Sequence, residues 1–86
     1  MSKTNIITIQ KGKPTLVENV LEGYPEYIKI MENVYAVKTD DNISTSDIRD
    51  NITKNCEDSL VFVMRSGVDA AWRITTNCSD WLKSNL

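Results

Sequence analysis

The order of strand-type and helix-type stretches limits the possible folds of this chain more than any other feature. Residues 5–10 (NIITIQ) are mostly β-branched and predict a first strand. Apolar residues then recur at helical spacing through 16–24, and Pro14 suits the first turn of that helix. The stretches 27–31 (YIKIM) and 34–39 (VYAVKT) are separated by two turn residues, so they predict a β-hairpin.

A start signal after this hairpin predicts a second helix. Ser44 suits the N-cap position, and Asp47 stands three residues later, as in a capping box. Ile43 and Ile48 occupy the positions of a hydrophobic staple across the same helix start. Ile48 also begins an apolar face that repeats every four residues, and we expect this face to pack against a sheet.

The last third of the chain predicts one more strand and a short tail. Residues 59–64 (SLVFVM) are apolar on both alternating sets of positions, which is typical of a central strand covered on both faces. Segment 70–74 predicts a short edge strand, and 79–86 (SDWLKSNL) predicts a final helical turn or two. Trp81 and Leu82 in this tail are expected to face the core.

The resulting order is strand, helix, strand, strand, helix, strand and a short C-terminal strand/helix tail. This order predicts an α+β fold, a ferredoxin-like βαββαβ sandwich, with residues 1–86 forming a single domain. Two helices would cover one face of the sheet, and the other face would lie open or against a second copy. A chain of 86 residues buries only about 60–65% of its unfolded surface, so we expect a homodimer.

Composition excludes several classes of function. The net charge of −2 argues against a protein that coats duplex DNA by charge alone. No apolar run approaches a membrane span or a signal peptide, so we expect a cytoplasmic protein with no membrane partner. Cys56 and Cys78 are then expected to be buried free thiols, with Cys78 the less buried. The absence of histidine removes Ser-His and Cys-His nucleophiles and the common zinc sites, and no small-molecule cofactor is expected.

Two groups of residues are candidates for binding. Lys11 and Lys13 flank a turn before a helix start, where amides and lysines attract phosphate, although a plain solvated turn is the favoured interpretation. Arg65, Trp72 and Arg73 combine guanidinium and indole groups that stack on nucleobases or anchor a protein interface. Trp72 and Trp81 are equally candidates for the anchor of a protein interface, and the alternative is that both tryptophans only close the open ends of a small sheet.

Acidic residues form the weakest candidate site. Asp40 and Asp41 are adjacent in a loop, and Asp47 and Asp50 follow in the second helix. Asp47 is better explained by the helix start, and Asp50 lies beside Arg49 on a solvated face. The sequence therefore predicts no metal site and no catalytic residues.

Several quoted stretches resemble a known family. VYAVKTDDNISTSDIRDNI, DSLVFVMRSG, AAWR and WLKSNL resemble the SinR-like small proteins of bacteria and phages, which are related in fold to the smaller CRISPR adaptation nuclease and to the VapD toxins. The resemblance covers residues 34–86, and residues 5–33 only in element order. It implies a ferredoxin-like fold and a homodimer.

This chain departs from its nuclease relatives at the first strand. Those relatives place an aspartate at the end of that strand, where two copies across the dimer axis hold a divalent metal. Here the strand ends in Gln10, followed by Lys11, and neither side chain is a good magnesium ligand. The resemblance therefore implies the fold more than the nuclease activity.

The sequence leads to one functional hypothesis and two alternatives. The hypothesis is a non-catalytic small binding or regulatory protein that acts as a homodimer on a protein or RNA partner. An accessory role in a phage or mobile element, of the anti-defence or antitoxin-like kind, suits the composition. The first alternative is a metal-dependent endoribonuclease of the VapD type. The second is a regulatory subunit whose sheet edge pairs with a partner strand.

Overall fold

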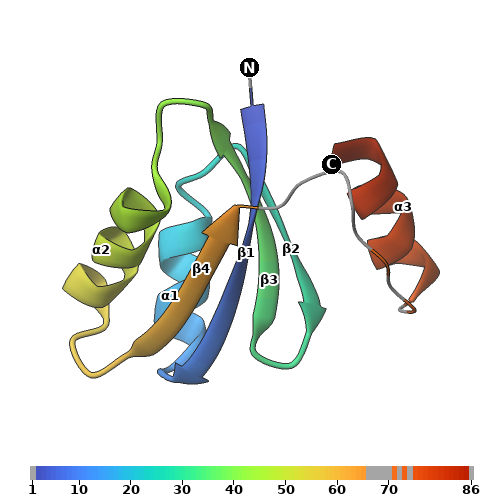
Figure 1. Cartoon of the computed structure of the whole chain (residues 1–86). Coiled ribbons are helices and arrows are strands. Elements are labelled where there is room, and N and C mark those ends of the chain that lie inside the picture. The colour runs from blue at the N-terminus through green and yellow to red at the C-terminus, as the bar shows by residue number, and fades with distance from the viewer. Residues whose placement is uncertain (1, 66–70, 72, 74, 86) are drawn as a thin grey trace.

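Four strands and three helices make up the part of the chain that the computed structural model describes, which is residues 2–65, 71, 73 and 75–85 (Figure 1). In chain order the elements are β1 (Ser2–Lys11), α1 (Pro14–Leu21), β2 (Glu26–Met31), β3 (Val34–Asp40), α2 (Thr45–Asn55), β4 (Leu60–Arg65) and α3 (Thr76–Asn85). The strands form one antiparallel sheet in the order β2-β3-β1-β4. This confirms the predicted α+β class, and the arrangement is compatible with a small ferredoxin-like domain. Within the described residues, no helix combines the length and apolar character that crossing a membrane requires.

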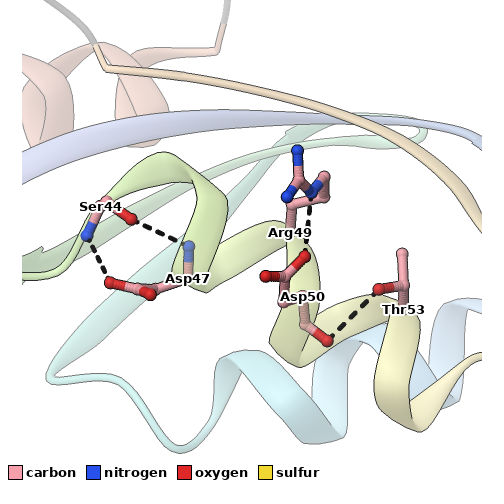
Figure 2. A network of polar contacts seen from close by, with 5 residues as sticks. All are labelled: Ser44, Asp47, Arg49, Asp50 and Thr53. Carbon is pink, nitrogen blue, oxygen red and sulfur yellow. Dashed lines mark hydrogen bonds and ion pairs between the residues drawn. The ribbon is translucent and has the colours of Figure 1, made fainter.

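The predicted start of α2 is confirmed in detail. The Ser44 hydroxyl accepts a hydrogen bond from the Asp47 amide at 3.0 Å, and the Asp47 carboxylate accepts one from the Ser44 amide at 2.9 Å (Figure 2). Both bonds satisfy helix-start amides that have no partner within the helix. The two hydrogen bonds to Ser44 hold the pKa of Asp47 below its ordinary value. Ile48 is buried and Ile43 packs against the same core.

Ser44→Ala should lower the free energy of unfolding by about 1 kcal/mol, because it removes the cap of α2. Ser46→Ala, at an exposed position of the same helix turn, is the matched control and should change stability by less than about 0.5 kcal/mol. Since the pKa of Asp47 is lowered on folding, its contribution is present above the ordinary carboxyl value of 3.8 and is lost as pH falls through the lowered pKa. Urea unfolding at neutral and acidic pH measures both effects, and equal stabilities of the two variants at neutral pH would contradict this role of the cap.

The main core lies between one face of the sheet and the helices α1 and α2 (Figure 1). Alternate residues of β1 and β3 point into it, and each helix contributes one apolar face. The buried members are Ile7, Ile9, Val17, Leu21, Tyr35, Val37, Ile48, Ile52 and Cys56. The expectation that two helices cover one sheet face is confirmed.

Helix α3 lies on the other side of the sheet, against β2 (Figure 1). The Cys78 thiol donates to the Lys29 carbonyl of β2, and the Thr4 hydroxyl of β1 donates to the Asn85 carbonyl at the end of α3. Cys78 is 6% exposed, the same as Cys56, so the prediction that Cys78 is the less buried thiol is wrong. Leu82 is buried as predicted.

The rest of the tail differs from the prediction in two ways. Trp81 is only half-buried, because Cys78 and Leu82 stand one turn apart and define the face that α3 turns to the sheet. The helix is also longer than the predicted turn or two. The edge strand predicted over 70–74 falls largely outside the described residues, and the two that are described, Ala71 and Arg73, belong to no strand.

The prediction of a central, doubly covered strand over 59–64 is wrong. Strand β4 is the edge of the sheet, next to β1. Its second face carries three exposed side chains, with exposed fractions of 52% for Leu60, 62% for Phe62 and 48% for Met64. Among the described residues, only one face of β4 is covered by helices, because α3 packs against β2 at the opposite edge of the sheet.

Candidate interaction surface

Three of the four large exposed apolar side chains on the described strands lie on β4, and the fourth is Met31 of β2. We call Leu60, Phe62 and Met64 the β4 patch, and all three point away from the core that α1 and α2 cover. The register places Phe62 opposite Thr8 and Met64 opposite Ile6 of β1. The patch therefore continues onto the outer face of β1, while α3 packs against β2 at the opposite edge of the sheet.

A shallow hollow of about 410 Å³ lies beside Phe62. It is lined by Thr8, Gln10, Leu60, Val61 and Phe62, and none of these side chains is charged. A surface of this kind recognises apolar groups by burial and supplies a few hydroxyl and amide partners for hydrogen bonds. It offers neither a nucleophile with an adjacent base nor a pair of carboxylates, which bond-breaking chemistry requires.

Lys11 and Lys13 are exposed, but their surroundings do not suit an anion. Pro14 has no amide hydrogen, and the amides of Leu16 and Val17 both donate to the Lys13 carbonyl. The helix start therefore offers few amides to a phosphate. A second hollow next to Lys13 is also lined by the carboxylates of Glu57 and Asp58, which repel anions.

Arg65 serves the fold rather than an open surface. Its Nε donates to the Asn5 side-chain oxygen at 3.3 Å, and its terminal nitrogen donates to the Ile43 carbonyl. Asn5 is fully buried in the sheet and donates in turn to the Thr39 hydroxyl at 3.0 Å. Arg73 is exposed, and Trp72 lies outside the described residues, so a shared surface of the three residues stays a prediction.

The acidic residues that the sequence singled out occupy different places in the fold. Asp47 caps α2, as predicted, and Asp50 pairs with Arg49 at 3.0 Å on an exposed face (Figure 2). Asp40 is the last residue of β3 rather than a loop residue as predicted, Asp41 lies in the loop before α2, and both are exposed. Across the described part of the chain, no three side chains of the metal-ligating kinds come close enough to share an ion.

Sequence reasoning missed the β4 patch, although one signal pointed to it. Residues Ile7 to Gln10 alternate between apolar and polar, which indicates a strand with one covered and one solvated face. A neighbouring strand in the same sheet shares that solvated face. The apolar residues of β4 on this face are therefore surface residues, which the run SLVFVM alone does not show.

The chain was compared with protein-family models, with curated proteins and with solved structures. None of the three comparisons gives a match. The resemblance of residues 34–86 to the SinR-like proteins therefore stays a prediction. The function has to be argued from the surface of this chain alone.

Proposed function

We propose that this protein is a non-catalytic binding protein that acts as a homodimer and recognises a protein partner through apolar contacts. One observation carries the proposal, which is the exposed β4 patch of Leu60, Phe62 and Met64. Three large apolar side chains at every second position of one strand lie next to one another on the same face. They form a contiguous surface, unlike single exposed residues scattered over a protein. Such surfaces are typical of protein interfaces.

The chemistry of this face favours protein over RNA. Single-stranded RNA is bound by aromatic platforms combined with positive charge along the backbone track. Phe62 is an aromatic platform, but the hollow beside it carries no cation. Lys38, on the same sheet face further from the edge, is paired with Glu26 at 3.5 Å. The net charge of −2 adds no attraction for phosphate.

The size of the chain favours a second subunit. A domain of 86 residues gains little from its single core, and bringing the β4 patches of two copies into contact in a dimer adds apolar contact without lengthening the chain. We also propose that the fold is the ferredoxin-like βαββαβ arrangement, with α3 added after β4. The element order and the strand order β2-β3-β1-β4 support this assignment.

Light scattering on the purified protein tests the proposal. The wild type should have about twice the 9.8 kDa chain mass at micromolar concentration. Phe62→Ser with Met64→Ser should give a folded monomer, whereas Leu16→Ser, which alters a 40% exposed leucine on α1, should remain dimeric. A wild-type monomer of 9.8 kDa would contradict the homodimer.

A separate experiment tests the choice of protein over RNA. A fluorescent single-stranded RNA titrated with the wild type at low salt should show no binding, and the RNA should stay intact with magnesium or manganese. RNA binding that the Phe62→Ser, Met64→Ser variant loses would assign the patch to RNA instead. Cleavage that a chelator abolishes would contradict the non-catalytic role.

A further inference from the structure

Strand β4 presents an open row of backbone hydrogen-bonding groups at the edge of the sheet. The Ile9 amide of β1 donates to the Asn33 carbonyl at 2.8 Å, on the side of β3. Along an antiparallel strand, the backbone amide and carbonyl groups of successive residues point to opposite sides. Those of Thr8 and Ile6 therefore point toward β4. Their partners there are Phe62 and Met64.

The same alternation decides which groups of β4 face outward. Phe62 and Met64 turn their amide and carbonyl groups toward β1, so Val61, Val63 and Arg65 turn theirs away from the sheet. In the described residues no strand pairs with this side of β4. The three outward-facing residues are spaced evenly about Val63.

This edge lacks the features that usually prevent pairing. Protected edges carry lysine, proline, a bulge or an inward-pointing charge. The sequence LVFVMR contains no lysine or proline, and its one inward-pointing charge, Arg65, stands at the end of the strand and is already bonded to Asn5 and Ile43. The irregularity in the β1–β4 register falls between Ile9 and Lys11, before the regular part of β4. An open edge with these properties is a template for another strand.

We propose that the second copy in the homodimer pairs its own β4 with this edge, antiparallel, around a two-fold axis that passes through Val63. The two sheets then become one continuous sheet, and the β4 patches of both copies lie side by side. This inference rests on the proposed homodimer and specifies its geometry. A two-fold axis brings the same strand from both copies into contact, so the edge has to be complementary to itself.

The directions of the backbone groups restrict the register. Residues whose backbone groups point away from the sheet must pair with residues of the same kind in the second copy. This allows only registers in which the side chains of the β4 patch stay on one face of the joined sheet. With Val63 on the axis, Val63 faces its own copy and Val61 faces Arg65 of the second copy. All three outward-facing residues of each strand are then used. A register with Phe62 on the axis pairs Val61 with Val63 and leaves Arg65 out.

The side chains suit the same register. Phe62 lies opposite Met64 of the second copy, and Met64 lies opposite Phe62, so two aromatic–thioether pairs form next to the axis. These are non-hydrogen-bonded positions, where facing side chains come closest. The two Arg65 residues lie at opposite ends of the paired segment, so their charges do not face each other.

Amide exchange followed by NMR tests the pairing on the wild-type protein. At a concentration where the dimer forms, the amides of Val61, Val63 and Arg65 should exchange at least about tenfold more slowly than in dilute solution, because the pairing hydrogen-bonds them. The amides of Phe62 and Met64 bond to β1 in either state and act as the internal reference. A dimer in which the amides of Val61 and Val63 remain unprotected would overturn the strand pairing and leave the homodimer standing. A monomer at all concentrations would overturn both.

A proline substitution removes one outward amide without touching the β1–β4 ladder. Val61→Pro should weaken dimerisation about ten- to a hundredfold, because the dimer loses one hydrogen bond from each copy. Proline is tolerated at sheet edges where no amide is needed, so the monomer should keep its fold. Val61→Ala is the matched control, since it shortens the same side chain and keeps the amide. Equal dissociation constants for the two variants, measured by sedimentation, would contradict the pairing.

Disulfide trapping checks the register. With Val63 on the axis, positions 62 and 64 of different copies face each other at about 4.5 Å between Cα atoms, within the range a disulfide spans. Mixed Phe62→Cys and Met64→Cys proteins should therefore cross-link under oxidation, whereas each variant alone should not, because like positions lie on a diagonal of about 7–8 Å. Cys56 and Cys78 are buried and do not compete. Efficient cross-linking of Phe62→Cys alone would overturn this register.

Discussion

Replacing Tyr35 with alanine is expected to lower the free energy of unfolding by about 3–5 kcal/mol. Tyr35 is the largest of the fully buried side chains, 2% exposed, near the start of β3. Its ring lies 6.4 Å from that of Tyr27, and its hydroxyl donates to the Glu18 carboxylate of α1 at 2.9 Å. Because a domain of this size has a total stability of about 5 kcal/mol, the remaining stability of about 0–2 kcal/mol should leave up to about half of the protein unfolded at room temperature.

The conservative variant Tyr35→Phe separates the ring from the hydroxyl. It keeps the packing and loses only the bond to Glu18, so it should cost about 0.5–1.5 kcal/mol. Circular dichroism during urea unfolding of both variants measures the difference. A loss from Tyr35→Phe as large as that from Tyr35→Ala would contradict the importance of ring packing.

The hydroxyl also makes stability depend on alkaline pH. Burial, and then the hydrogen bond to Glu18 and its negative charge, raise the pKa of Tyr35 from 10.0 to about 12. A group whose pKa is raised on folding contributes stability that is complete below its unfolded value and is lost as pH rises through the folded value. The wild type should therefore lose stability between pH 10.0 and about 12, and Tyr35→Phe should lose less of it over the same range.

Local signals in the sequence predicted most of the elements correctly. The capping residues Ser44 and Asp47 act within one helix turn, so their pattern is visible without any tertiary information. The first three strands were equally clear, since β-branched runs separated by turn residues depend on neighbouring positions. Strand ends still differed, and β1 extends from Ser2 to Lys11 rather than over 5–10 alone.

Features that depend on distant parts of the chain were not predictable in this way. Whether β4 is central or at an edge is decided by strand order, and whether Phe62 is covered is decided by where α3 packs. An apolar run carries neither kind of information. The same limit applies to Arg65, whose partners Asn5 and Ile43 are 60 and 22 residues away along the chain.

Arg65→Ala is expected to lower the free energy of unfolding by about 2–4 kcal/mol, which is the second large effect. Removing the guanidinium leaves the side-chain oxygen of Asn5 without this donor inside the sheet, where Asn5 is fully buried. An unsatisfied buried polar group pays its full desolvation cost, which exceeds the value of an ordinary hydrogen bond. The Ile43 carbonyl before α2 loses its donor as well.

Arg73→Ala is the matched control, because it removes the same kind of side chain at an exposed position. It should change stability by less than about 0.5 kcal/mol. Combining Arg65→Ala with Asn5→Ala should cost less than the sum of the two single variants, since the second change removes the group that the first leaves unsatisfied. Urea unfolding of the wild type, the two single variants and the double variant gives this coupling energy directly. If Arg65→Ala proved as harmless as Arg73→Ala, the arginine would be available for a partner, and its role in holding the end of β4 to β1 and α2 would be wrong.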